Sequence, residues 1–276
     1  MADACFAIPK QNWKGPDVGR LLTVVTAGLL CVFALTGCAS KKTLTAEEIL
    51  RSGDTQLGRQ RGDKARGYYQ QLLEEYPENR YKAEVQFKIA ESLYSEKSYL
   101  EARFEYEKFL ELYPQHPLSA QAQFQIGMCH AQELNPFDRD QKVTLDALRA
   151  FRLFRQKYPQ DTLLQEAEAQ ILFLRQRLAE HEFDVAQFYY QKEAYQAAIR
   201  RLLNLIQVYP DMSDMDSAFF MLADSYRREE NYVKAARVFH TLVDRFPTSA
   251  YVSRAAARLR SLPDTGISRD TNGAVP

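Results

Sequence analysis

The residues of this sequence best suited to catalysis or metal binding are four histidines and a cysteine beside one of them. No two of the histidines His116, His130, His181 and His240 stand at a spacing that would bind a metal ion together with carboxylates. Cys129 precedes His130, but neighbouring residues of a helix point in different directions, which favours a buried thiol over a Cys–His nucleophile. The sequence contains no Walker loop, Rossmann glycine signature or Gly-x-Ser-x-Gly motif. We therefore predict that the protein is not an enzyme and has no catalytic residues, metal site or cofactor.

A second cysteine, Cys38, stands where a bacterial export signal would attach a lipid. Arg20 precedes an apolar run of about 15 residues, Leu21 to Leu35, which is shorter than the roughly 20 residues that span a bilayer. A positive flank, a short apolar core and small residues before a cleavage position form a secretory signal peptide. The run ends in Leu-Thr-Gly-Cys, which resembles the bacterial lipobox and implies cleavage before Cys38 and acylation of the chain there, palmitate included. The alternative is a plain signal peptide with a chance cysteine.

The expected location of the mature protein follows from the residue after Cys38. In enteric bacteria an aspartate at that position retains lipoproteins in the inner membrane, and this sequence has Ala39 instead. We therefore expect lipid anchoring at the periplasmic face of the outer membrane, where each buried methylene adds about 0.8 kcal/mol of membrane affinity. On this interpretation residues 1–37 are a removed lipoprotein signal peptide and residues 38–44 are a lipidated tether.

Composition limits the remaining possibilities. The chain carries 36 basic and 36 acidic side chains, so it has no positive excess for binding nucleic acid or an anionic membrane surface. No glycine occurs from Met128 to Thr265 and no proline from Gln160 to Tyr209, which leaves the middle of the chain poor in helix breakers. This distribution favours an all-α fold over β-sandwiches and doubly wound sheets, which need turn glycines at short intervals.

Five aromatic–proline dipeptides divide the chain into repeats: Tyr76-Pro77, Tyr113-Pro114, Tyr158-Pro159, Tyr209-Pro210 and Phe246-Pro247. Twelve residues before each proline stands an alanine, and eight and five residues before it stand large apolar residues: Ala65, Ala102, Ala147, Ala198 and Ala235; Tyr69, Tyr106, Phe151, Leu202 and Phe239; Leu72, Phe109, Phe154, Leu205 and Leu242. The pattern resembles the tetratricopeptide repeat, a helix pair in which a small residue allows close approach, bulky residues fill the interface, and proline ends the second helix. We therefore predict an all-α solenoid of about five helix pairs, the alternative being unrelated amphipathic helices.

Two departures from the repeat spacing predict a loop and a long helix. Eight extra residues between Gly127 and Ala147 include the breaker-rich stretch 135–140, which we expect to be a loop inside repeat three. Fourteen extra residues between repeats three and four contain neither glycine nor proline, so residues 162–192 read as one long helix or two nearly collinear helices. The predicted domains are residues 45–160 with repeats one to three, residues 161–262 with the linking helix and repeats four and five, and a disordered tail at 263–276.

The first helix of each repeat is expected to line the inner face of the solenoid. Its fifth position carries Leu50, Phe87, Phe124, Phe183 and Phe220, and its twelfth carries Leu57, Tyr94, Ala131, Tyr190 and Arg227. An aromatic row at these positions would receive an extended or C-terminal peptide with aromatic side chains. We expect the N-terminal set, Phe87, Tyr94 and Phe124, to be exposed as a peptide groove. The alternative, that these phenylalanines pack against neighbouring repeats, remains open.

Two stretches resemble a narrower family. One is Asp138-Arg139-Asp140-Gln141, followed by Ala147, Phe151, Phe154 and Tyr158-Pro159; the other runs from Arg177 through Tyr189 to Arg201 and ends at Tyr209-Pro210. Both resemble the BamD family, lipoproteins of the outer-membrane β-barrel assembly machinery. The resemblance implies that the C-terminal repeats dock on the barrel protein BamA and that the N-terminal repeats contact unfolded barrel precursors. It also implies partner-binding roles for Arg201, Arg139 and Asp140, although Arg201 has the simpler alternative of a surface or helix-dipole arginine.

Together these features predict an outer-membrane lipoprotein scaffold that binds a BamA-like barrel protein, other assembly-machinery subunits and unfolded outer-membrane proteins, and no nucleic acid. One alternative is a pilotin-like repeat lipoprotein that escorts a secretin or a pilus component. Another is an enzyme, or an accessory of cell-wall enzymes, which would need a polar constellation that we do not find in the sequence.

Overall fold

The computed structural model describes residues 43–136 and 139–263. The chain divides into two units, residues 1–44 and 45–276, and of the first unit only Thr43 and Leu44 are described. The expected signal peptide, Cys38 and the tail beyond Pro263 therefore lie outside the described residues. Within the part that is described, no helix is both long enough and apolar enough to span a bilayer.

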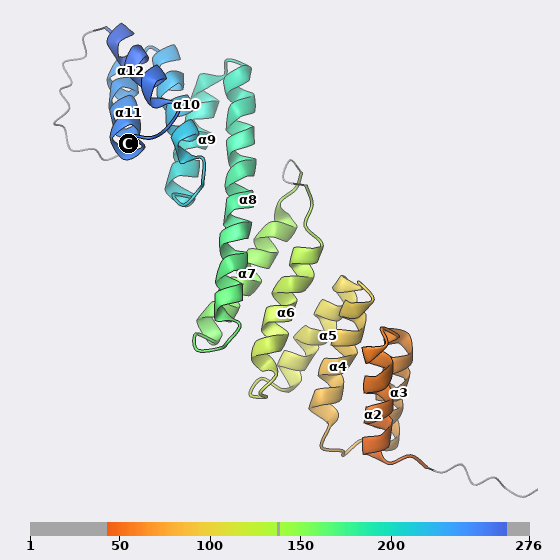
Figure 1. Ribbon diagram of the computed structural model, residues 1–276. Helices are drawn as coiled ribbons and strands as arrows, with labels where there is room; N and C mark the ends of the chain where they lie inside the picture. Colours follow the sequence, from red (N-terminus) through yellow and green to blue (C-terminus); the bar gives the residue numbers. More distant parts are fainter. Residues whose placement is uncertain (1–42, 137–138, 264–276) are drawn as a thin grey trace, which may run out of the picture. The chain divides into compact units, whose positions relative to one another are not determined.

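Eleven helices, and no strand, make up the regular structure of the described residues. They are α2 (Ala46–Gly58), α3 (Gly62–Glu75), α4 (Lys82–Ser95), α5 (Tyr99–Leu112), α6 (Ser119–Gln132), α7 (Lys142–Lys157), α8 (Leu164–Gln191), α9 (Tyr195–Val208), α10 (Met215–Arg228), α11 (Tyr232–Arg245) and α12 (Val252–Ser261). They form five consecutive pairs, α2–α3 to α10–α11, followed by α12, and each helix packs against the next one along the chain (Figure 1). The predicted all-α solenoid of helix pairs is confirmed.

The second helix of each pair carries the residues that close the pair. The five alanines twelve residues before the prolines are fully buried, and the bulky residues at the other two offsets are at most 1% exposed. On the facing helix the small position is Gly53, Ala90, Gly127, Ala186 or Ala223, each of them buried. A Cβ atom added to Gly127 would lie 2.7 Å from the Phe151 ring, and one added to Gly53 would lie 2.5 Å from the Tyr69 ring. Close approach of the two helices therefore requires glycine in these two pairs.

Each second helix ends at the aromatic residue before its proline. Tyr76, Tyr113, Tyr158, Tyr209 and Phe246 have φ between −133° and −125° and ψ between 55° and 65°. Proline disfavours the α-helical region for the residue before it, because the proline ring would clash with that residue's backbone. The predicted helix stops are confirmed at all five sites.

Four of the five pairs turn through a left-handed residue that is not glycine. These residues are Gln60, Lys97, Glu193 and Glu230, with φ between 57° and 65°. At each turn the next N–H donates back into the first helix, for example from Asn231 to the carbonyl of Tyr226 at 2.9 Å, which satisfies the helix C-terminus. The third pair differs, since α6 ends at Gln132 and α7 begins at Lys142, and this gap is the loop that the extra residues predict.

The long helix α8 belongs to two hydrophobic cores. Its 28 residues span about 42 Å at 1.5 Å per residue, which confirms the helix expected between repeats three and four. Ile171, Leu174 and Leu178 pack into the core of repeat three, and from the next residue onward Ala179 and Ala186 pack into the core of repeats four and five. One helix thus contributes to both groups of repeats.

The final helix, α12, was not expected from the sequence as a separate element. It packs on α11 and buries Ala255 completely. Arg254, Arg258 and Arg260 are exposed, and the first two also reach α10. This helix therefore covers the fifth helix pair.

Candidate functional site

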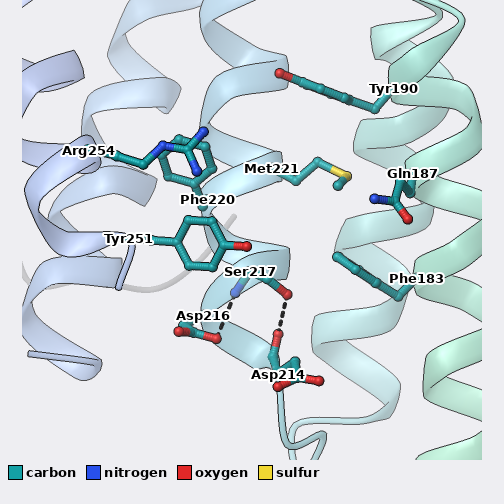
Figure 2. A pocket seen from close by; sticks show the side chains of 10 residues that line it. All are labelled: Phe183, Gln187, Tyr190, Asp214, Asp216, Ser217, Phe220, Met221, Tyr251 and Arg254. Carbon is teal, nitrogen blue, oxygen red and sulfur yellow. Dashed lines mark hydrogen bonds between the residues drawn. The ribbon is translucent and has the colours of Figure 1, made fainter. Parts of the chain in front are cut away.

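A groove of about 460 Å³, called the C-terminal groove below, lies among α8, α10 and α12 (Figure 2). Phe183, Gln187 and Tyr190 line it from α8, Asp214, Asp216, Ser217, Phe220 and Met221 from the start of α10, and Tyr251 and Arg254 from the start of α12. Phe183 and Phe220 hold the fifth position of their repeats, and Tyr190 holds the twelfth. The groove therefore uses the positions predicted for peptide contact, but in the C-terminal repeats.

The walls of the C-terminal groove are aromatic. Phe220 stacks on Tyr251 with 5.0 Å between ring centroids, and it meets Phe239 of α11 edge-on at 5.9 Å. The guanidinium of Arg254 lies 4.6 Å from the Phe220 centroid and 5.5 Å from that of Tyr251, a cation–π arrangement. Figure 2 shows Phe183 on the opposite side of the groove, on α8. These contacts hold the rings of α10 and α12 in place without filling the space between them and α8.

Two carboxylates lie at the start of α10, at one end of the C-terminal groove. Asp216 accepts hydrogen bonds from Ser249 Oγ at 2.5 Å and from the backbone N–H of Ser217 at 2.9 Å. Ser217 Oγ in turn donates to the carbonyl of Asp214 at 2.6 Å, and the Asp214 residue is exposed. Carboxylates in this position are favoured by the helix dipole, and they make this end of the groove negative.

A buried carboxylate connects the three helices that form the groove. Asp224 of α10 is 2% exposed, and it accepts hydrogen bonds from Tyr190 Oη of α8 at 2.5 Å and from Arg227 Nε at 2.8 Å. Arg258 of α12 lies 3.7 Å from the same carboxylate. Burial raises the pKa of Asp224, but the hydrogen bonds from Arg227 and Tyr190 outweigh it and leave the pKa below its ordinary value. Burial and the hydrogen bond to Asp224 raise the pKa of Tyr190 to about 12, so its hydroxyl remains a donor at neutral pH.

The expected exposure of the N-terminal aromatic set is wrong for Phe87 and Phe124, which are 3% and 4% exposed. Phe87 meets Tyr106 edge-on with 5.4 Å between centroids, and Phe124 meets Phe151 in the same way at 5.5 Å. The alternative, packing against neighbouring repeats, is correct in that both rings are buried, but the rings that they contact belong to the second helix of the same pair. Burial of these rings is favoured over exposure because each ring removes a large apolar area from water. Tyr94 is only half-buried, and its contact with a peptide stays a prediction.

Arg201 lies on α9 and reaches back to α8. Its Nη1 atom is 3.2 Å from Glu182 Oε2, and its side chain remains 45% exposed. An exposed ion pair of this kind contributes only about 0–1 kcal/mol to stability, so it can be exchanged for a pair with another chain at little cost. The partner-binding role of Arg201 stays a prediction.

Arg139 and Asp140 lie in the loop between α6 and α7, and both are exposed. Asp140 Oδ1 accepts a hydrogen bond from the backbone N–H of Lys142 at the start of α7, at 3.1 Å. Arg177 of α8 donates to the carbonyl of Asn135 at 2.6 Å and so ties the loop to the long helix. The structure thus places the two predicted loop residues in repeat three and Arg201 in repeat four.

The candidate catalytic pair is not activated. Cys129 is fully buried, and burial raises the pKa of its thiol to about 12, so it stays protonated at neutral pH and is a poor nucleophile. Burial also lowers the pKa of His130. Across residues 43–136 and 139–263, no three His, Cys, Asp or Glu side chains are placed to hold a metal ion.

Sequence reasoning missed Tyr251 and Arg254, because α12 was not expected. A signal for this helix was present in the sequence. Eight residues after each proline stands a small or branched apolar residue that is fully buried: Val85, Ala122, Ala167, Ala218 and Ala255. The last of these places another first helix after Pro247.

Family models match most of the helical region. The YfiO family, described as outer membrane lipoprotein, matches residues 42–231, and a tetratricopeptide repeat model matches residues 217–249. The chain is 24% identical over 224 residues to the outer membrane protein assembly factor BamD of Pasteurella multocida, with 76% of this chain and 85% of that protein covered. For the BamD of Haemophilus influenzae the identity is 24% over 220 residues, with 74% and 84% covered. For that of Caulobacter vibrioides it is 26% over 211 residues, with 74% and 69% covered.

Proposed function

This chain belongs to the YfiO family of outer membrane lipoproteins, and from that membership we propose that it is a scaffold that binds a BamA-like barrel protein and unfolded outer-membrane protein precursors. A general role in outer-membrane protein assembly is supported by the BamD relatives, whose alignments cover most of both chains. The observation that carries the proposal is the extent of the family match, residues 42–231. It runs through the loop of repeat three and through α8, the two features that depart from plain repeat spacing.

Association with the outer membrane is supported by the family and by the BamD relatives. We propose the finer arrangement that Cys38 carries the lipid and that the helix pairs face the periplasm. The support is the Leu-Thr-Gly-Cys sequence after a short apolar run, followed by Ala39. Several acyl chains at one cysteine would hold the protein stably at the membrane surface.

Arg201 is the proposed contact with the barrel protein. Its guanidinium is exposed beside Glu182, and a carboxylate of another chain can replace Glu182 or bind next to it. Arg139 and Asp140 offer a second exposed group of charges on the loop that Arg177 ties to α8. Charged residues at such positions determine partner choice and orientation more than they determine affinity.

The test compares two arginines of the same helix. Arg200 and Arg201 are both exposed on α9 and point in different directions. With Arg201→Glu we expect about tenfold less barrel protein to co-purify from native membranes, because the partner's carboxylate would then face a carboxylate. Arg200→Glu is the matched control and is expected to leave the yield within about twofold.

The outcomes separate the candidate functions. Full recovery of the barrel protein with a folded Arg201→Glu variant would remove the contact assigned to this residue. Capture of a secretin or a pilus component, with no barrel protein, would replace the assembly role by an escort role. Crosslinking to cell-wall enzymes alone would indicate that the protein is an accessory of those enzymes.

A further inference from the structure

The C-terminal groove combines an apolar surface with charges of both signs. We propose that it binds an extended segment of a partner protein in which one aromatic or large aliphatic side chain stands between a basic residue and an acidic residue. This proposal rests on the proposed function, because it requires that the chain hold other proteins.

The groove is large enough to take a side chain. Its whole volume of about 460 Å³ lies within the range of roughly 300–1,000 Å³ that is usual for ligand pockets. Phe183 and Phe220 approach it from different helices (Figure 2), and the flexible side chain of Met221 can adapt to a ring or to a branched chain. A single apolar anchor buried between such walls supplies much of the affinity of a short segment.

The charged groups specify the residues that flank the anchor. Figure 2 shows Asp214 and Asp216 at one end of the groove and Arg254 at another. Asp216 is held by Ser249, and Arg254 is held over the ring of Phe220, so both charges have defined positions. A basic side chain of the bound segment would pair with the carboxylates, and an acidic one with the guanidinium.

Two further observations favour a polypeptide as the ligand, and a third favours its binding. Gln187 lines the groove from α8, and its amide can donate to and accept from the backbone of an extended segment. The paired carboxylates are unfavourable for the phosphates of nucleic acid. The Asp224 contacts also hold α8, α10 and α12 together before binding, so little ordering would be needed when a segment arrives.

The test measures the binding of short fluorescent peptides to the full chain in detergent. Each peptide consists of glycine and serine around a central Lys-Phe-Glu or, for the opposite chain direction, Glu-Phe-Lys. We expect at least one of them to bind, and we expect exchange of its phenylalanine for alanine to raise Kd by about tenfold or more.

Charge-reversal variants then locate the bound peptide. Arg254→Glu and Asp214→Lys are each expected to raise Kd by about fivefold, and a peptide with lysine on both sides of phenylalanine is expected to recover binding to Arg254→Glu. Arg260→Glu and Asp244→Lys are matched controls, because they reverse exposed charges outside the groove. Circular dichroism confirms that each variant is folded.

Several results would overturn the proposal. They are failure of both peptides to bind, equal binding by Arg254→Glu and the parent chain, and self-association of the chain that the groove variants abolish. Binding that appears only after removal of residues 264–276 would assign the groove to the chain's own tail instead. Recovery of the barrel protein is measured in parallel: if it persists while peptides do not bind, only the groove assignment fails, and if it is absent from the parent chain, the proposed function fails.

Discussion

Phe124 in repeat three and Phe183 in repeat four hold the same position of the helix pair, but their surroundings differ. Phe124 is 4% exposed and packs edge-on against Phe151 of its own pair. Phe183 is only half-buried and lines the C-terminal groove, and the second helix of its pair offers Leu202 and Leu205 in place of aromatic rings. A repeat position therefore determines where a side chain points, whereas the facing helices determine whether it becomes core or binding surface.

The largest expected effect tests this contrast directly. Phe124→Ala should lower the free energy of unfolding by about 3–5 kcal/mol, because it leaves a cavity under Phe151. Phe183→Ala should cost less, about 1.5 kcal/mol, because the ring is only partly buried. Urea denaturation followed by circular dichroism measures both values. Equal losses would show that the two rings are equally part of the core.

A second contrast concerns two tyrosine–aspartate hydrogen bonds. Tyr190 Oη donates to the buried Asp224, whereas Tyr69 Oη donates at 2.9 Å to Asp54, whose side chain is 40% exposed. Asp224→Asn should lower the free energy of unfolding by about 2–3 kcal/mol, since it removes hydrogen bonds to a buried charge. It should also speed hydrogen exchange in α12, which Arg258 joins to this carboxylate. Asp54→Asn is the control and should cost less than about 1 kcal/mol.

The effect of Asp224→Asn should depend on pH. The folded protein holds the pKa of Asp224 below its ordinary value of 3.8. A lowered carboxyl pKa stabilises the folded state above the unfolded value, and this stabilisation is lost as the pH falls through the folded pKa. The difference in free energy of unfolding between the parent chain and the variant should therefore be largest at neutral pH and should decrease below about pH 4. If this difference in free energy stayed constant into strong acid, the charged state of Asp224 in the folded protein would be contradicted.

The smallest expected effect compares two helical glycines. Gly127→Ala should destabilise the chain by about 1–2 kcal/mol, because the new Cβ would lie 2.7 Å from the Phe151 ring. Gly67 has no atom within 4 Å of an added Cβ, so Gly67→Ala should stabilise the chain by about 0.5–1 kcal/mol through helix propensity. Thermal unfolding shows whether each substitution raises or lowers the stability of the chain. A stabilising Gly127→Ala would show that the first and second helices of this pair do not approach so closely.

Much of the fold could be predicted, because the repeat pattern records contacts within one helix pair. Ala147, Phe151 and Phe154 lie on one face of α7. The distance to α6 determines where a small residue is needed and where a bulky one fits. The proline after each second helix acts even more locally, on the single residue before it. The loop of repeat three and the length of α8 followed from the placement of glycine and proline.

The candidate site could be predicted only in part. Phe183 and Phe220 from the fifth position and Tyr190 from the twelfth line the C-terminal groove, although Phe220 is only 8% exposed, and peptide contact at these positions stays a prediction. The choice of the N-terminal repeats was wrong for Phe87 and Phe124, because a large apolar residue at the fifth position can reach either the second helix of its pair or open space. Sequence spacing alone does not distinguish the two outcomes.

The pairing of the helices and the residue at which each one stops can be derived from the sequence, because both depend on residues within a helix pair. The accessibility of the aromatic rings follows only from the packed helices. Accessibility depends on the rings that the facing helix of the pair offers, as Phe151 does to Phe124, and on contacts between different pairs, such as the hydrogen bond from Tyr190 to Asp224 across 34 positions of the chain. Such contacts are set by how whole helices meet, and no single repeat encodes them.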